Sequence, residues 1–207
     1  MNFKKLQTMQ LELDNSILSA KPKMTAEERF NKTLVALSVE TAEVANCAER
    51  FKFWKDNKGK IDEDKFDTWV KDGSNNEWYE YFDKDNNILK ITKEQAHKLT
   101  LVEEASDCLH FILSLANQIG YEIENDIAEG INIKFEKTEW NFLELQFQIS
   151  ILYGKVKEFD DSYKDSLYII IKEFLEYISM LGITTQELEQ VYYEKNEENY
   201  RRLREGY

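Results

Sequence analysis

The chain has 207 residues, of which 32% are charged and 42% hydrophobic, and its formal net charge is −13. A surface this acidic repels phosphate backbones and anionic membranes, so we expect neither a nucleic-acid nor a membrane partner. The two cysteines are too few for a disulfide framework, and no apolar run approaches the ~20 residues needed to span a bilayer. The N-terminal segment mixes apolar residues with charges and is unlike a secretory signal, so the sequence predicts a cytoplasmic protein.

Helical periodicity runs along nearly the whole chain, which contains one proline and seven glycines. This pattern predicts an all-α fold, a helical bundle in a single domain over residues 1–207. The first predicted helix covers residues 3–19. Thr25 and Glu28 have the spacing of a capping box, and they predict a second helix that continues to about Trp54.

The periodicity fails between the second and third predicted helices. Residues 56–91 are rich in Asp, Asn, Lys and Gly with scattered aromatic residues, and we interpret them as an irregular insertion at about 56–91. Thr92 and Gln95 form another capping box, which predicts a third helix ending at Gln118, before a glycine.

The rest of the chain is again periodic. We expect a weaker helix around residues 122–136, an apolar helix beginning at Thr138, and another over residues 163–181. Thr184 and Glu187 cap the last helix. The two apolar helices serve packing, whereas the last helix ends in a basic cluster of Lys195, Arg201, Arg202 and Arg204.

Two pairs of acidic residues lie within apolar helical segments. Glu40 and Glu43 belong to the second predicted helix, and Glu104 and Asp107 to the third. Residues three apart share one helical face, and carboxylates are rarely buried unless they are paired or bind a cation. If the two helices lie antiparallel, the four carboxylates form a cluster of hard oxygen donors that suits Mg²⁺. Either pair alone is better explained by solvated surface, because the chain contains 40 acidic residues, whereas two such pairs on apolar faces favour a metal site.

Two further groups of residues have both a structural and a functional interpretation. Lys52 and Lys55 flank Trp54 at the predicted end of the second helix. They either complement the helix dipole and pack on the core, or contact phosphates while Trp54 packs on a sugar or base. His110 and Phe111 follow Asp107, and each is either a core residue or a ligand contact.

Four segments together resemble the dimeric dUTP pyrophosphatases (dUTPases), a branch of the all-α NTP pyrophosphatases to which the MazG-like proteins also belong. E-x-x-E with E-x-x-D marks the superfamily, whereas the FKxW element and the C-terminal motif indicate the dUTPases. The segments span almost the whole chain: Gln10 with Asp14 and Ile17, ETAE at 40–43 followed by FKFWK at 51–55, EEASDCLHF at 103–111, and KNEENYRRLREGY at 195–207.

The resemblance implies a homodimeric enzyme that hydrolyses dUTP to dUMP and diphosphate. Magnesium would be held by Glu40, Glu43, Glu104 and Asp107, and Glu40 or Glu43 would orient the attacking water. Such an attack on the α-phosphorus needs negative charge neutralised at the nucleophile and at the leaving diphosphate.

The resemblance also assigns the substrate contacts. Gln10 would bind the edge of uracil, while His110 and Phe111 would pack on the deoxyribose and disfavour a 2′-hydroxyl. The residues expected around the phosphates are Lys52, Trp54, Lys55, Lys195, Asn199, Arg202 and Tyr207.

Two alternatives remain open from the sequence. The first is a related pyrophosphatase of other base specificity, such as dCTP, because a glutamine amide offers both a donor and an acceptor and can flip. The second is a non-catalytic helical interaction protein whose acidic residues only solvate its grooves. Turnover of a panel of nucleotides distinguishes dUTP specificity from the first alternative. The effect of Mg²⁺ on the melting temperature distinguishes a metal-binding enzyme from the second.

Overall fold

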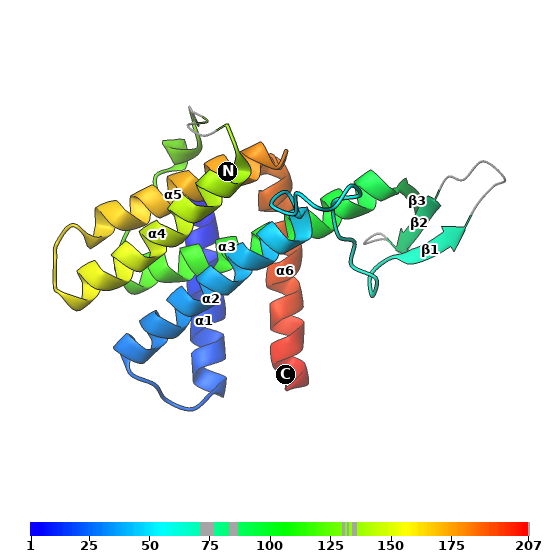
Figure 1. The fold of residues 1–207 in the computed structure, drawn as a ribbon. Coiled ribbons are helices and arrows are strands. Elements are labelled where there is room, and N and C mark those ends of the chain that lie inside the picture. Colours follow the sequence, from blue (N-terminus) through cyan, green and yellow to red (C-terminus); the bar gives the residue numbers. More distant parts are fainter. Residues whose placement is uncertain (71–76, 83–86, 130, 132, 134–135, 207) are drawn as a thin grey trace.

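The computed structural model describes residues 1–70, 77–82, 87–129, 131, 133 and 136–206. These residues form six α-helices and one small sheet (Figure 1), so the all-α class is confirmed. The helices are α1 (Phe3–Ala20), α2 (Ala26–Ala48), α3 (Lys93–Gln118), α4 (Thr138–Lys157), α5 (Tyr163–Met180) and α6 (Thr185–Glu205).

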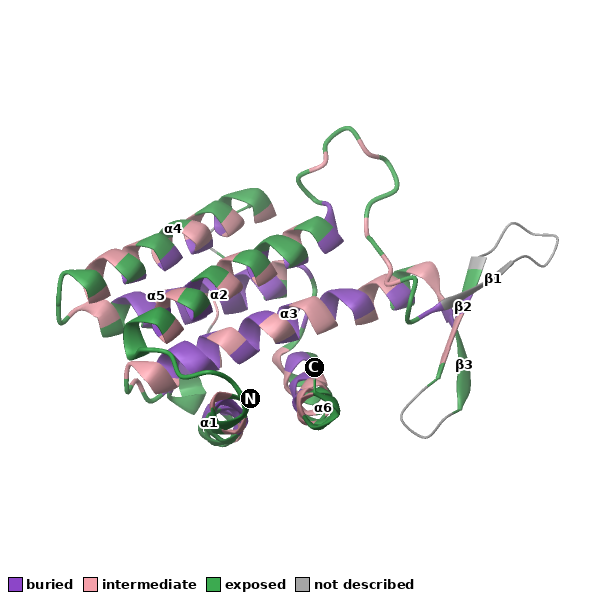
Figure 2. Cartoon of the chain, turned by 90° about the horizontal axis from the view of Figure 1, so that it is seen from below, coloured by how far each residue is buried: buried purple, intermediate pink, exposed green. Residues whose placement is uncertain are grey.

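The long helices α2 and α3 lie side by side and run in opposite directions (Figure 1). α4 and α5 form a hairpin that packs beside them, while α1 and α6 cross α3 and are seen end-on in Figure 2. Thr25, Thr92 and Thr184 each begin a helix with the reciprocal hydrogen bonds of a capping box, as their sequence spacing predicts. This arrangement brings one face of α2 toward one face of α3.

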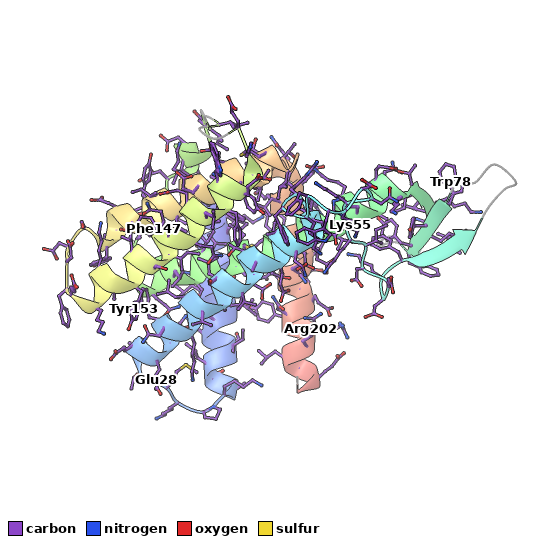
Figure 3. All side chains as sticks on the ribbon, in the orientation of Figure 1. Glu28, Lys55, Trp78, Phe147, Tyr153 and Arg202 are labelled. Carbon is purple, nitrogen blue, oxygen red and sulfur yellow. The ribbon has the colours of Figure 1, made fainter. Side chains whose placement is uncertain are left out.

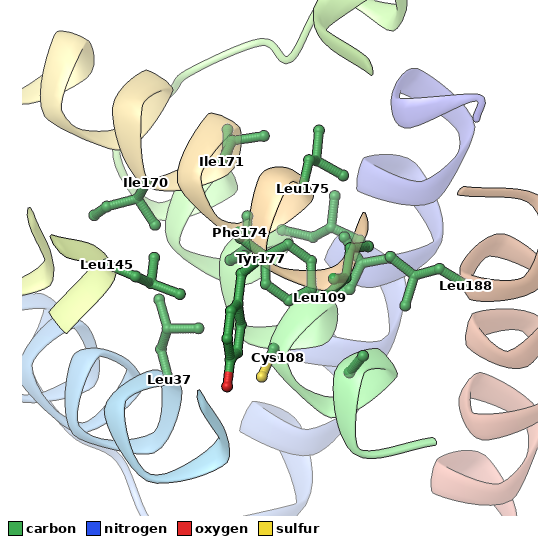
Figure 4. Close-up of a cluster of buried hydrophobic side chains, with 14 of the residues drawn as sticks. Leu37, Cys108, Leu109, Leu145, Ile170, Ile171, Phe174, Leu175, Tyr177 and Leu188 are labelled. Atoms are coloured by element: carbon green, nitrogen blue, oxygen red, sulfur yellow. The ribbon is translucent and has the colours of Figure 1, made fainter. Parts of the chain in front are cut away.

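The main hydrophobic core takes residues from all six helices, and α3 contributes the largest number of them. Figure 4 shows Leu37, Leu109, Leu145 and Phe174 packed together, and each is almost fully buried. The buried side of every helix faces this core, and the outer sides are exposed (Figure 2). Within the described residues, every helix is too short or too polar to traverse a lipid bilayer.

Two of the predicted helices are shorter than expected. α2 ends at Ala48 rather than near Trp54, because Glu49 adopts a left-handed conformation with φ of 55° and its N–H closes the last turn on the Ala45 carbonyl. Around residues 122–136, the described part contains only one short 3₁₀ turn, Asn125–Ala128.

The insertion is more ordered than its composition indicates. It contains a three-stranded antiparallel sheet in the order β1 (Asp67–Val70), β2 (Glu77–Phe82), β3 (Ile88–Thr92). Tyr79 pairs with Ile91, and both join Phe66 and Ala96 in a second, small hydrophobic cluster. β3 leads directly into α3, so the sheet sits at the N-terminal end of that helix (Figure 1).

Candidate functional site

The antiparallel packing of α2 and α3 brings three glutamates together. Glu40, Glu43 and Glu104 each offer a carboxylate oxygen, and these oxygens all lie within 4.8 Å of one another. Burial and the neighbouring carboxylates raise the pKa of Glu40 to about 7, and the same causes raise the pKa of Glu104 to about 7. The negative charges of this cluster repel one another, and its hard oxygen donors are the kind that bind a divalent cation.

Asp107 lies close to the three glutamates but has a cation of its own. Its Oδ2 is 3.0 Å from the Lys195 Nζ of α6, and Lys195 also contacts Glu103 Oε1 at 3.1 Å. The other oxygen of Glu103 is 2.5 Å from Lys65 Nζ. Burial still raises the pKa of Asp107, and its charge contributes to the raised pKa of Glu40. The described structure therefore joins three of the four predicted metal ligands directly and holds the fourth beside them.

A cleft of about 510 Å³ opens next to these acids, between α1, α2, α3 and α6. It is the point where segments from both ends of the chain meet. Figure 3 shows one of its cations, Arg202, on α6. The cleft is lined by eight of the residues predicted from sequence: Gln10, Glu40, Asp107, His110, Phe111, Lys195, Asn199 and Arg202.

One wall of the cleft is a buried polar network. The Gln10 Nε2 donates to Asp14 Oδ1 at 2.8 Å, and Gln10 Oε1 accepts from the Tyr192 hydroxyl at 3.1 Å and lies 2.7 Å from His110 Nδ1. The Tyr192 ring stacks on the imidazole of His110 with centroids 4.3 Å apart. Burial lowers the pKa of His110 to about 3, so the imidazole is neutral at physiological pH.

The FKFWK segment lies outside the cleft. It follows α2 as a loop around Glu49, whose side chain is 2% exposed and is contacted by Lys52 Nζ at 2.8 Å and Lys55 Nζ at 2.5 Å. Trp54 is 66% exposed and lies edge-on against Phe53. Figure 3 shows Lys55 in this loop, apart from Arg202. Lys52, Trp54 and Lys55 are not among the described residues that line the cleft, and Tyr207 lies outside the described residues.

Sequence reasoning gave no role to several residues that the structure places at the site. Asp14, which was quoted only as part of the family resemblance, is the centre of the polar network and lies one turn after Gln10. Tyr192 supports both Gln10 and His110 from α6, and Glu103 shares Lys195 with Asp107. Nothing in the local sequence marks these last two, because their partners lie far away along the chain.

A helical bundle with a carboxylate cluster beside a cleft is what the resemblance to the α-helical nucleotide pyrophosphatases implies. Residues 2–73 and 89–207 match the family model described as dUTPase. The chain therefore belongs to the dUTPase family, and it is a hydrolase of nucleotide metabolism that acts on dUTP. No curated protein matches it. The internal gap in the match, residues 74–88, falls within the insertion that carries the small sheet.

Proposed function

We propose that the chain hydrolyses dUTP to dUMP and diphosphate with Mg²⁺ held by Glu40, Glu43, Glu104 and Asp107. The observation that carries this proposal is the convergence of Glu40, Glu43 and Glu104 within 4.8 Å beside the cleft. The donor set fits the ion, because carboxylate oxygens are the ligands that Mg²⁺ prefers in proteins. Asp107 supplies a fourth oxygen donor one turn beyond Glu104.

The chemistry needs a positioned water and neutralised phosphate oxygens. A bound divalent cation supplies Lewis-acid neutralisation of the phosphate charge. The carboxylate of Glu40 or Glu43 orients a water for in-line attack on the α-phosphorus and accepts its proton. The bond from the α-phosphorus to the bridging oxygen breaks, and the diphosphate departs. Glu40 lines the cleft and is half-buried, whereas Glu43 is exposed. Substitution of each glutamate in turn would show which of them orients the water.

Cations from α6 support the leaving group in this proposal. Lys195 and Arg202 line the cleft from α6, and Asn199 lies one turn from each along the same helix. Their charges offset the negative charge that builds up on the diphosphate. The family resemblance further assigns Gln10 to the edge of uracil, and His110 and Phe111 to the deoxyribose. It also assigns four residues outside the cleft lining to the phosphates: Lys52, Trp54, Lys55 and Tyr207.

We also propose a homodimer, with each chain a single cytoplasmic domain. The homodimer is supported by an apolar stripe on the outer face of α2 and α4, in which Val35 and Leu143 are each more than half exposed. Val39 and Leu143 also line an apolar groove of about 690 Å³ that reaches Glu43. A second copy would bury this stripe. The two cysteines are buried and free, which fits a reducing compartment.

Turnover of dUTP, dCTP, dTTP and UTP with Mg²⁺ or with a chelator tests the proposal. We expect hydrolysis of dUTP that chelation abolishes and Mg²⁺ restores, with dUMP and diphosphate as the products. Equal rates on dUTP and dCTP would contradict the proposed specificity for dUTP. Rates unaffected by chelation would contradict the proposed requirement for a metal ion. Light scattering on the purified chain and on Leu143→Glu tests the dimer, because a charge in the stripe should yield monomers.

A further inference from the structure

The ammonium group of Lys195 lies between two carboxylates of α3. Its Nζ is 3.0 Å from Asp107 Oδ2 and 3.1 Å from Glu103 Oε1. Glu103 and Asp107 are four residues apart on the helix, so their side chains project from the same face. The side chain of Lys195 is only 14% exposed, so these ion pairs are shielded from solvent and are stronger than pairs on an open surface.

Glu103 has a different place from the other acids around it. It does not belong to the carboxylate cluster of α2 and α3, and it is not among the described residues that line the cleft. Its second oxygen, Oε2, is 2.5 Å from Lys65 Nζ. The two oxygens of Glu103 are thus engaged by two lysines, one from the insertion and one from α6. The carboxylate joins these two segments to α3, one residue from the proposed metal ligand Glu104.

The insertion holds Lys65 in this position. The Asp62 N–H donates to Thr100 Oγ1 at 3.1 Å, which ties the segment to α3 one turn before Glu103. The Phe66 N–H donates to the Asp62 carbonyl at 3.2 Å and closes a turn around Lys65. The ring of Phe66 is 2% exposed and packs in the small hydrophobic cluster of the insertion. Lys65 therefore reaches Glu103 from an anchored turn.

The ion pair of Lys195 with Asp107 conflicts with the proposed role of Asp107 as a metal ligand. An ammonium group and a divalent cation on the same carboxylate repel each other, so Asp107 cannot bind the ion and keep its full attraction for Lys195. Glu103 is the second carboxylate in contact with Lys195, and it is not one of the proposed ligands. It can therefore retain the ammonium group when Asp107 binds the cation.

We propose that Glu103 is a positioning residue, which keeps the Lys195 ammonium group beside the metal site when Asp107 binds the cation. The inference rests on the proposed function. Lys195 then remains at the cleft that it lines, where its charge is available to phosphate oxygens. Lys65 holds the other oxygen of Glu103, so that Oε1 faces Lys195. Through this contact the insertion contributes to the arrangement of the site.

The first measurement is the affinity of the nucleotide-free protein for Mg²⁺, by isothermal titration calorimetry. We expect Glu103→Gln to weaken binding about 3- to 30-fold, because Lys195 is then left with Asp107 as its charged partner and competes with the ion for it. Glutamine has nearly the shape of glutamate, and circular dichroism checks that the variant is folded. The measurement requires no hydrolysis.

A double-mutant cycle with Lys195→Met tests whether Glu103 acts through Lys195. Lys195→Met alone should tighten Mg²⁺ binding, because it removes a charge that repels the ion. In that background Glu103→Gln should change the affinity little, since no ammonium group competes for Asp107 and Lys65 neutralises the charge of Glu103. An equal loss of affinity in both backgrounds would mean that Glu103 acts on the ion directly, and it would overturn the proposal.

Lys65→Met is the matched control, because it breaks the other ion pair of Glu103. Glu103 then keeps its charge for Lys195 alone and draws the ammonium group more strongly away from Asp107. We therefore expect Mg²⁺ binding that is as tight as in the unsubstituted chain or tighter, which is the opposite of the effect of Glu103→Gln. Weaker binding in both variants would show that general damage to the ion-pair network lowers the affinity, and it would overturn the positioning role.

The outcomes separate this inference from the proposed function. An unsubstituted chain that does not bind Mg²⁺ refutes the proposed metal site, and the role of Glu103 fails with it. A chain that binds Mg²⁺ but shows equal effects of Glu103→Gln with and without Lys195 refutes the positioning role alone. Coupled effects in a chain that does not hydrolyse dUTP would support the role of Glu103 at a metal site and refute the proposed reaction.

Discussion

Two glutamates associated with α2 have opposite electrostatics. Glu40 is half-buried among carboxylates, and burial together with those neighbours raises its pKa to about 7. Glu49, just past the end of the helix, is only 2% exposed, yet its pKa is lowered to about 2: hydrogen bonds from Lys52 and Lys55 outweigh the effect of burial. Burial alone therefore does not decide the charge. The chain supplies its own cations to the structural carboxylate of Glu49, whereas the carboxylate of Glu40, which we propose to be catalytic, lies among other acids and would be neutralised by a bound cation.

Glu40→Gln tests the catalytic side of this comparison and should have the largest effect. We expect the rate of dUTP hydrolysis to fall by about 10²- to 10⁴-fold, the range for loss of a general base. Melting of the metal-free variant, followed by circular dichroism, should not be lowered, because the substitution removes a repelling charge. Glu197→Gln is the control, since Glu197 is an exposed acid of α6. An equal loss of rate in both variants would contradict the assignment.

Addition of Mg²⁺ tests whether the cluster awaits an external cation. At a concentration of 100 Kd, a ligand that binds only the folded state stabilises it by about 2.7 kcal/mol. We expect a rise of several degrees in the melting temperature, measured by differential scanning calorimetry and reversed by EDTA. The rise should disappear in a Glu40→Gln/Glu104→Gln double variant, whereas its persistence would place the ion elsewhere.

Glu49→Gln tests the structural side. Glutamine keeps one acceptor but loses the charge-assisted bonds to Lys52 and Lys55, so we expect a loss of about 1–3 kcal/mol in the free energy of unfolding. Urea denaturation measures it. The stabilisation by Mg²⁺ should be the same in the variant and in the unsubstituted chain, because Glu49 is not part of the acidic cluster. A reduced effect of Mg²⁺ would show that the two groups of acids are coupled.

The sequence predicted what depends on local spacing. Thr25, Thr92 and Thr184 cap their helices through residues three positions away, so the helix starts were correct. The convergence of Glu40 and Glu104 followed from helical periodicity and antiparallel packing. The caps need no knowledge of distant contacts, whereas the convergence of the acids depended on the assumption that the two helices pack antiparallel.

What escaped prediction depends on contacts between distant segments. Glu49 ends α2 because its carboxylate is held by Lys55 and by the N–H of Gly59, in a loop that has no helical pattern. The strands of the insertion depend on pairing across turns rather than on any local period. The ion pair of Asp107 with Lys195 joins α3 to α6, so a residue predicted to meet phosphate contacts an acid in this structure.

The pH dependence of stability tests the difference between Glu49 and Glu40 further, through the lowered pKa of Glu49. A carboxylate with a lowered pKa binds protons more weakly in the folded state, so its stabilisation is complete above the unfolded pKa of about 4.5 and is lost as the pH falls toward about 2. We expect the difference in unfolding free energy between the unsubstituted chain and Glu49→Gln to be constant above pH 5 and to shrink steadily below pH 4.5. Subtracting the variant cancels the titration of the other carboxylates, which both proteins share. Urea denaturation at pH 6, 4 and 3 measures this difference. A difference that does not change over this range would mean that Lys52 and Lys55 contribute little to holding the Glu49 charge, and that the loop is held by the Gly59 N–H and by packing instead.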